Sequence, residues 1–240
     1  QATHFAQVFQ IARSAKLVGE RVALEHVPFG LVLGEDGKKF KTRSGETVKL
    51  RALLEEALTR ARSDIVARLQ QEGRQESEAF VEQVARSVGI GAVKYADLAM
   101  NRQSNYRFSF DKMLSLSGNT APYMMYAYAR IRGIQRRAGQ AVDVQNAPLL
   151  LHTAAELNLA RQLLLLPQVI MEVERDLLPS KLCEYIFATA GKFNQFYEQC
   201  SVLGAETEGL KASRLAMCDV TASVLGLSLR LLGIDVLERL

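Results

Sequence analysis

The chain has 240 residues, of which 48% are hydrophobic and 23% are charged, and its mean hydropathy is close to zero. This length and composition are typical of a globular protein with one or two domains, and they exclude fibrous and intrinsically disordered classes. The net charge of +4 at pH 7 permits a polyanionic partner such as a nucleic acid without requiring one.

Cysteine and histidine are too scarce and too scattered to indicate a metal site. Cys183, Cys200 and Cys218 include no Cys-x-x-Cys pair, and the chain has only three histidines. We therefore expect buried free thiols in a reducing compartment and no protein-bound metal. No unbroken apolar run approaches the ~18 residues of a membrane span, so no membrane partner is expected. The first residue is Gln and no signal-peptide pattern follows it, so the sequence is interpreted as part of a longer chain.

The first 49 residues are predicted to mix helix and strand. Residues 4–18 place apolar side chains at helical spacing, whereas residues 21–33 are rich in Val, Leu and Phe and predict one or two strands. A Glu-Asp-Gly turn follows at residues 35–37. Residues 1–49 are therefore predicted to form the end of an α/β unit.

From residue 50 onward the sequence predicts a mainly α-helical bundle. Apolar residues recur at helical spacing, and Gly or Pro stands at the joints between the periodic segments. The predicted helices cover, in chain order, about residues 50–71, 77–101, 119–138, 147–165, 168–176, 180–203 and 210–232. Between the second and the third of them, residues 105–111 alternate apolar and polar side chains and are predicted to be extended.

A strongly basic loop separates these two parts. Residues 38–43 hold four cations, with Thr and Ser hydroxyls beside them and glycines on both sides. Ammonium and guanidinium groups next to exposed backbone N–H groups suit a polyphosphate whose charge is being redistributed. The alternative is a solvated hairpin tip, which is the usual role of an isolated basic loop.

The second basic region is the helix predicted at residues 119–138. Asn119 or Thr120 can cap its N-terminus, and Pro122 falls in the first turn, where its missing N–H costs little. Helical spacing places four residues on one face, namely Tyr123, Tyr126 (or Ala127), Arg130 and Arg137. Arg132 and Arg136, four residues apart, form an adjacent basic ridge.

The charge of this region favours an RNA-binding role. Residues 107–139 contain six Lys or Arg and one acidic residue, Asp111, which is a net charge of +5. Tyr rings beside guanidinium groups suit unstacked bases flanked by phosphates in an RNA loop. The alternative is an ordinary amphipathic helix, with Tyr and Ile in the core and Arg in solvent.

Several segments resemble arginyl-tRNA synthetases, a family of class I aminoacyl-tRNA synthetases. Residues 34–50, GEDGKKFKTRSGETVKL, look like the signature loop of the family, and residues 1–5, QATHF, look like its QxxHF segment at the floor of the active site. Residues 118–134, GNTAPYMMYAYARIRGI, resemble its anticodon-binding helix in the eukaryotic-type variant, and residues 94–114, KYADLAMNRQSNYRFSFDKML, resemble the segment leading into it. The tail at residues 232–240, LGIDVLERL, is similar to the family's C-terminus.

The resemblance implies a fold, a reaction and a set of partners. Residues 1–49 would be the C-terminal remnant of a Rossmann-like, nucleotide-binding catalytic domain, and residues 50–240 would be an all-helical anticodon-binding domain. The full-length protein would be an arginine–tRNA ligase that attaches arginine to tRNA(Arg) through arginyl-adenylate, using ATP with Mg²⁺. Its partners would be tRNA(Arg), arginine and ATP, and membership of a larger assembly is compatible with this role.

The resemblance also implies roles for individual residues. Gln1 would contact the substrate arginine, and His4 would lie near ATP. Three cations of the basic loop align with the class I KMSKS motif and would stabilise the pyrophosphate: Lys39, Lys41 and Arg43. Thr42 stands where the second lysine of that motif would be, which is a departure from it. The residues that map onto the tRNA-binding helix are Tyr123, Tyr126, Arg130, Arg132, Arg136 and Arg137.

Half of the implied active site is missing from the sequence, because no HIGH-like element is present. The His26-Val27 pair continues as Pro28-Phe29-Gly30 instead. The fragment alone is therefore not expected to aminoacylate tRNA. A non-catalytic RNA-binding or scaffold subunit of a larger assembly is the main alternative, and a helical protein-interaction module without an RNA role is a third. The expected compartment is the cytoplasm, or an organelle if an upstream transit peptide exists.

Overall fold

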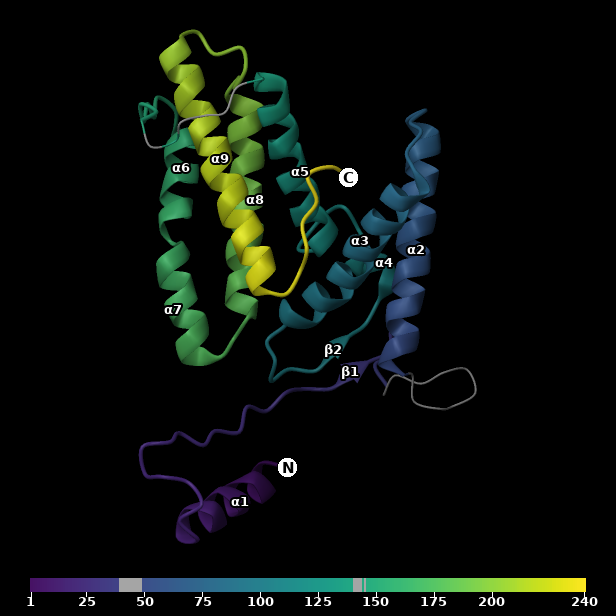
Figure 1. Ribbon diagram of the computed structural model, residues 1–240, viewed down its shortest axis with the longest axis vertical. Coiled ribbons are helices and arrows are strands. Elements are labelled where there is room, and N and C mark those ends of the chain that lie inside the picture. Colours follow the sequence, from purple (N-terminus) through teal and green to yellow (C-terminus); the bar gives the residue numbers. More distant parts are fainter. Residues whose placement is uncertain (39–48, 140–143, 145) are drawn as a thin grey trace.

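The computed structural model describes residues 1–38, 49–139, 144 and 146–240, and this part of the chain is mainly helical (Figure 1). Its helices are α1 (Ala2–Ser14), α2 (Leu50–Gln71), α3 (Glu78–Leu98), α4 (Phe110–Met113), α5 (Ala121–Ala138), α6 (Ala154–Leu164), α7 (Leu166–Asp176), α8 (Ser180–Gln199) and α9 (Glu208–Leu231). Two short strands, β1 (Val32–Leu33) and β2 (Tyr106–Arg107), pair in parallel. The mainly α fold class predicted from the sequence is confirmed.

The N-terminal arm, residues 1–38, contains less strand than the sequence predicts. In residues 21–33 only Val32–Leu33 is a strand, because a strand needs a hydrogen-bonding neighbour and β2 offers two residues. The backbone just before β1 is held by side chains instead: Arg102 donates to the Pro28 carbonyl over 2.6 Å, and Asn105 accepts from the Leu31 N–H over 2.7 Å. Helix α1 buries no residue and lies apart from the other helices (Figure 1).

Helices α2 and α3 form a closely packed hairpin that joins the arm to the rest of the protein. The Ser77 hydroxyl caps α3 by accepting a hydrogen bond from the Phe80 N–H over 3.2 Å. Gly89 faces Ala57 so closely that an added Cβ would lie 2.9 Å from the Ala57 carbonyl oxygen. The absence of a side chain at Gly89 therefore allows the two backbones to approach.

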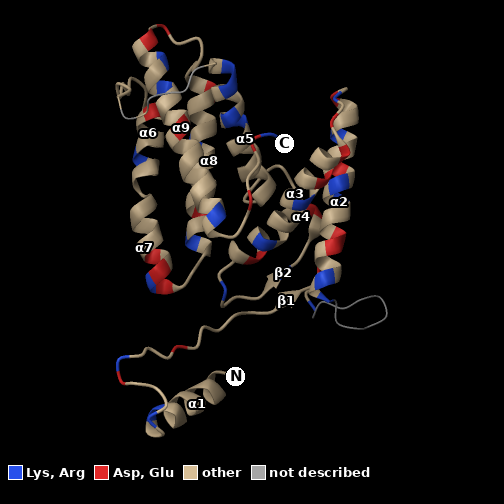
Figure 2. Ribbon diagram, in the orientation of Figure 1, with Lys and Arg blue, Asp and Glu red and all other residues tan. Residues whose placement is uncertain are grey.

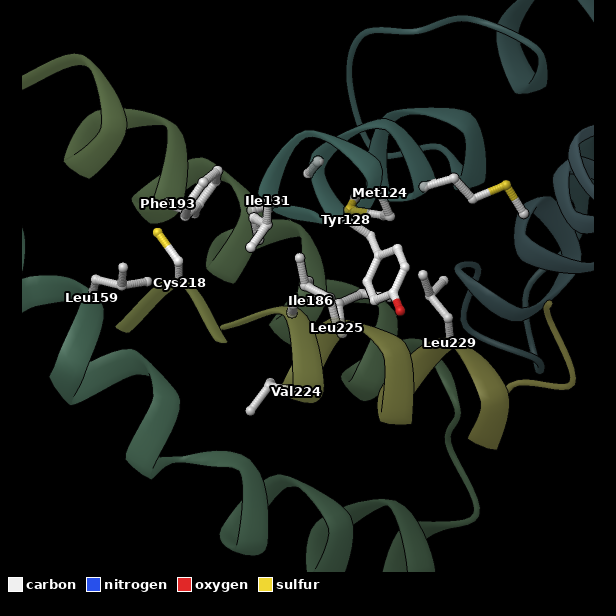
Figure 3. Packing of buried hydrophobic residues seen from close by; sticks show 14 of the residues in the cluster. Met124, Tyr128, Ile131, Leu159, Ile186, Phe193, Cys218, Val224, Leu225 and Leu229 are labelled. Atoms are coloured by element: carbon white, nitrogen blue, oxygen red, sulfur yellow. The ribbon is translucent and has the colours of Figure 1, made fainter. Parts of the chain in front are cut away.

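The main hydrophobic core lies between α5, α6, α8 and α9 (Figure 3). Ile131 from α5, Ile186 from α8 and Leu225 from α9 are fully buried and converge on one another. Helix α7 packs against α8, and α3 contacts α5. The large buried side chains fix α5 and α8 side by side, and this arrangement positions the candidate site described below.

The tail, residues 232–240, leaves α9 and crosses the bundle to the α2–α3 hairpin (Figure 1). Gly233 adopts a left-handed conformation (φ +70°), which turns the chain and inserts Ile234 into the core. At its far end the Leu240 carbonyl accepts a hydrogen bond from Arg74, and the Arg239 guanidinium lies 4.9 Å from the centre of the Phe80 ring. The tail therefore ties the hairpin to the bundle.

The three cysteines are free and buried, as predicted. Burial raises the pKa of both the Cys183 and the Cys218 thiol to about 12, so these two remain protonated at neutral pH. Helix α9 has the length and mean hydropathy of a membrane span, although the sequence contains no unbroken apolar run of that length. Because 67% of its most apolar window is buried, α9 fits the role of a core helix.

Candidate nucleic-acid interface

The tyrosines and arginines singled out from the sequence lie on α5, whose ends follow from local chemistry. Thr120, rather than Asn119, is the N-cap, and its hydroxyl accepts a hydrogen bond from the Tyr123 N–H over 3.3 Å. Gly139 ends the helix in a left-handed conformation (φ +70°). Nine buried residues form a broad stripe along the helix, namely Ala121, Pro122, Met124, Met125, Ala127, Tyr128, Ala129, Ile131 and Ile134. The polar side chains are therefore divided between two flanks of this stripe.

One flank faces α8 and carries three of the predicted residues. The Arg130 guanidinium lies 4.8 Å from the centre of the Tyr126 ring, within the range of a cation–π contact. Tyr126 is exposed, whereas Tyr123 and Arg130 are half-buried at the junction with α8. The structure thus brings Tyr123, Tyr126 and Arg130 together, and Ala127 is buried instead of sharing this surface.

Helix α8 contributes three residues to this surface that the sequence interpretation missed. Asn194 donates from Nδ2 to the Tyr123 hydroxyl over 2.7 Å and accepts from Arg130 at Oδ1 over 3.2 Å. The Tyr197 ring centre lies 5.9 Å from the Arg130 guanidinium, and the Phe187 ring meets Tyr123 edge-on at 5.9 Å. We call these six residues of the two helices the α5–α8 face: Tyr123, Tyr126, Arg130, Phe187, Asn194 and Tyr197.

The sequence did contain a signal for the α8 residues. Asn194 and Tyr197 are three positions apart, and Phe187 precedes Asn194 by two helical turns, so all three lie on one flank of α8. What the sequence could not supply is the identity of the helix that this flank faces, because that depends on the packing of the core.

The opposite flank of α5 carries Arg132, which is engaged within the protein. Its guanidinium lies 5.1 Å from the Tyr128 ring centre, donates to the Tyr128 hydroxyl over 3.1 Å, and stands 3.5 Å from a carboxylate oxygen of Asp219 and 3.5 Å from one of Glu238. Burial lowers the pKa of Arg132, but the hydrogen bond to Tyr128 and the two carboxylates outweigh it and raise the pKa overall.

Arg136 continues the basic ridge predicted beside Arg132, and it too contacts the tail. It donates to the Glu238 backbone carbonyl over 2.9 Å and lies 3.9 Å from the Glu238 carboxylate. Figure 2 shows the basic end of α5 near the tail, which carries acidic residues. Arg137, expected on the Tyr123 surface, is exposed and donates to the Gly133 carbonyl of its own helix over 3.3 Å. The ridge exists, but Glu238 offsets much of its charge.

The two remaining cations of the basic segment lie at a separate place. Arg107 and Lys112 line a hollow of about 470 Å³ between α3 and residues 106–120, together with the rings of Tyr106 and Phe108. The net charge of +5 is therefore spread over three surfaces and does not form one continuous patch.

The candidate catalytic residues belong to the N-terminal arm and the basic loop. Gln1 and His4 are exposed at the start of α1, and His4 lies beside the Phe5 ring, which stacks on His26 at 4.6 Å. Lys39, Lys41 and Arg43 lie outside the described residues. Within the part of the chain that the structure describes, no three His, Cys, Asp or Glu side chains gather as a metal site would require.

Comparison with known proteins accounts for both parts of the chain. The family model described as "tRNA synthetases class I (R), catalytic domain" matches residues 1–110, and the "DALR anticodon binding domain" model matches residues 124–240. A curated arginine–tRNA ligase from Nostoc punctiforme is 60% identical over 241 residues, and one from Picosynechococcus is 55% identical over 244 residues. Both alignments include 100% of this chain.

The chain belongs to the arginyl-tRNA synthetase family. It spans 41% of the length of these two curated relatives and corresponds to their C-terminal part. Both relatives are cyanobacterial proteins, and the eukaryotic-type variant expected from the sequence stays a prediction. The boundary at residue 49 also stays a prediction, since the catalytic-domain model extends through α2 and α3.

Solved arginyl-tRNA synthetases share this arrangement of helices. The enzyme from Plasmodium falciparum superposes with a TM-score of 0.80 at 33% identity, covering 100% of this chain and 40% of that one. The Thermus thermophilus arginyl-tRNA synthetase superposes with a TM-score of 0.76 at 29% identity, covering 90% of this chain and 35% of that one. The order of a catalytic-domain tail followed by a helical bundle is therefore the arrangement of the arginyl-tRNA synthetase fold.

Proposed function

We propose that this chain is the C-terminal portion of an arginine–tRNA ligase and supplies its signature loop and anticodon-binding domain. The full-length protein joins arginine to tRNA(Arg) in two steps through arginyl-adenylate. One observation carries this proposal: the catalytic-domain model and the anticodon-binding-domain model match in succession along one chain. That chain also aligns over its whole length with curated arginine–tRNA ligases.

The helical bundle would bind the anticodon stem and loop of tRNA(Arg), with the α5–α8 face as its centre. Tyr126 offers an exposed ring, and stacking of a base on such a ring contributes about 1–3 kcal/mol. Arg130 adds a planar cation beside that ring, which suits a phosphate or a base face. Arg132, Arg136 and Arg137 would act at the edge of this surface, where the tail carboxylate already offsets part of the charge of Arg132 and Arg136.

The arm and the basic loop would serve the reaction with ATP. Gln1 would hold arginine and His4 would lie near the nucleotide, while Lys39, Lys41 and Arg43 would stabilise pyrophosphate as it departs. Catalysis of this type depends on placing the reactants and stabilising charge, for which cations on a Gly-flanked loop are suited. Mg²⁺ would arrive bound to the phosphates of ATP.

The activity is tested on the full-length protein that contains this chain. We expect arginine-dependent exchange between ATP and pyrophosphate, and charging of tRNA(Arg) with arginine. The 240-residue chain alone is expected to show neither reaction but to bind tRNA(Arg) weakly, with an affinity that falls steeply as salt is raised. Charging of a different tRNA, or no exchange with arginine, would refute the ligase proposal.

The site assignment has its own test. The Arg130→Ala, Arg132→Ala double variant of the full-length protein should bind tRNA(Arg) at least about tenfold more weakly than the wild type. If the affinity is unchanged, the tRNA does not use α5. Binding without exchange or charging in the full-length protein would support a non-catalytic RNA-binding subunit instead.

A further inference from the structure

Asn194 occupies a central position in the α5–α8 face. Its carboxamide bridges two residues of α5, donating from Nδ2 to the Tyr123 hydroxyl over 2.7 Å and accepting from Arg130 at Oδ1 over 3.2 Å. The neighbouring residues Phe193 and Phe196 are fully buried in the core and hold α8 in place independently of these two contacts. Asn194 itself is only half-buried, at the rim of the surface.

The chemistry of the partners fixes the orientation of this carboxamide. A guanidinium has donors and no acceptor, so the Asn194 atom that faces Arg130 must be the oxygen. The amide nitrogen therefore faces Tyr123 and donates to its hydroxyl oxygen. Because that oxygen accepts from Asn194, the proton of the Tyr123 hydroxyl must point elsewhere, and it meets no acceptor among the described residues.

We propose that Asn194 is a positioning residue of the RNA-binding face, which presents the Tyr123 hydroxyl as a hydrogen-bond donor and holds Arg130 beside Tyr126. The face then selects an RNA loop nucleotide that offers an acceptor, such as a base carbonyl or an unprotonated ring nitrogen. This inference rests on the proposed function and adds to it the chemical character of the nucleotide edge that the face reads.

The decisive substitution is Asn194→Asp, which changes the shape of the side chain very little. A carboxylate accepts hydrogen bonds only, so the Tyr123 proton turns inward and the outward donor is lost. The carboxylate also pairs with Arg130, and that part of the loss should appear as a shallower salt dependence, which Tyr123→Phe does not share. Binding of fluorescein-labelled tRNA(Arg) to the full-length protein should weaken about tenfold. Gln195→Glu is the matched control, because it adds the same charge to an exposed neighbouring position of α8, and it should change the affinity less than about twofold.

A double-mutant cycle separates positioning from a general structural role. Tyr123→Phe removes the hydroxyl but keeps the ring, so it should weaken binding at least as much as Asn194→Ala, which leaves the hydroxyl in place and removes only the amide that orients it. In a Tyr123→Phe background no hydroxyl is left to orient, so adding Asn194→Ala should weaken binding further by less than about twofold. The slope of log affinity against log salt should be unchanged in all three, because none of them removes a cation. Unchanged melting temperatures would verify that all variants are folded.

Two outcomes would overturn the inference while leaving the proposed function intact. Arg130→Ala could weaken RNA binding while Asn194→Asp behaves like Gln195→Glu, or the effects of Tyr123→Phe and Asn194→Ala could simply add. If Arg130→Ala leaves RNA binding unchanged, the α5–α8 face is not the RNA-binding surface, and the site assignment of the proposed function is wrong as well.

Discussion

The two flanks of α5 carry the same kinds of residue but give them opposite partners. On the α8 side, Arg130 contacts Tyr126, Tyr197 and Asn194, all neutral, and no carboxylate among the described residues. On the tail side, Arg132 lies 3.5 Å from both Asp219 and Glu238. The comparison teaches that the position of an arginine on a basic helix does not decide its role. The charge of its partners does.

This difference has a simple electrostatic consequence. An arginine held by neutral acceptors keeps its full charge for an incoming phosphate, and its orientation is already fixed. An arginine between two carboxylates must exchange them for the phosphate, so the gain on binding is smaller. We therefore expect substitutions on the α8 side to change RNA binding, and substitutions on the tail side to change mainly stability.

Arg214 has a purely structural role, and its substitution should give the largest loss of unfolding free energy among the arginines compared. It donates to the fully buried Glu156 carboxylate over 2.7 Å and to the Ser201 carbonyl over 2.9 Å, linking α9 to α6. Arg214→Met should lower the free energy of unfolding by about 3–5 kcal/mol, because Glu156 is left buried and unpaired. Urea denaturation measures this loss. The salt dependence of RNA binding by the folded variant should be unchanged, and a shallower slope would contradict the structural assignment.

The same ion pair should make stability depend on pH. Burial raises the pKa of Glu156, but hydrogen bonds from Arg214, Thr153 and the His152 N–H outweigh it and hold the pKa below its ordinary value. The contribution of this carboxylate is therefore complete above the unfolded-state pKa of about 4.3 and is lost as the pH falls through the folded-state pKa. In the Glu156→Gln variant, the decline in unfolding free energy below about pH 4.3 should be shallower than in the wild type.

Arg132→Ala should cost less than the loss of Arg214, about 1–2 kcal/mol of unfolding free energy. The Arg132 side chain is 26% exposed, and the substitution removes its contacts with Tyr128, Asp219 and Glu238. Its effect on tRNA affinity should be smaller than that of Arg130→Ala. Equal losses of affinity in the two variants would show that the two flanks serve RNA alike.

Arg130→Ala should reverse this pattern. We expect tRNA affinity to fall about tenfold and the slope of log affinity against log salt to decrease by about one, since one phosphate contact is lost. Unfolding free energy should change by less than about 1 kcal/mol, because the bond to Asn194 is at the rim of the face. A salt titration of RNA binding and a urea denaturation of each variant compare the two arginines by their contributions to RNA affinity and to stability.

Most of the fold could be predicted from periodicity and helix-end chemistry. The helix predicted at residues 50–71 is α2 (Leu50–Gln71), and the helices predicted farther along are all present. The largest difference in bounds is at α6, which begins at Ala154 and not at residue 147. Thr153 and Glu156 form a capping box there: their side chains accept hydrogen bonds from the first free backbone N–H groups, and this fixes the start of the helix at Ala154. The strands of residues 21–33 could not be judged from local sequence, because strand pairing depends on a distant partner.

Only the α5 part of the candidate site could be predicted from the sequence. Helical spacing on α5 correctly grouped Tyr123, Tyr126 and Arg130, because that grouping is local. The contributions of Asn194 and of Glu238 depend on which elements pack beside α5, and no spacing rule within one helix contains that information. This limit also explains why Arg132 and Arg130 looked equivalent until their partners were known.

The substitution with the smallest expected effect, Glu238→Gln, tests the flank of α5 that contacts the tail. Glu238→Gln removes the carboxylate that Arg132 and Arg136 share, so both cations become available to phosphate. We expect tRNA affinity to rise about two- to threefold, with a steeper salt dependence, and unfolding free energy to fall by less than about 1 kcal/mol because the Glu238 side chain is 64% exposed. Asp235→Asn is the control: it removes the same charge from an exposed position of the tail that has no ion pair among the described residues. If both variants raise the affinity equally, the gain comes from net charge alone, and Glu238 does not restrain the arginines of α5.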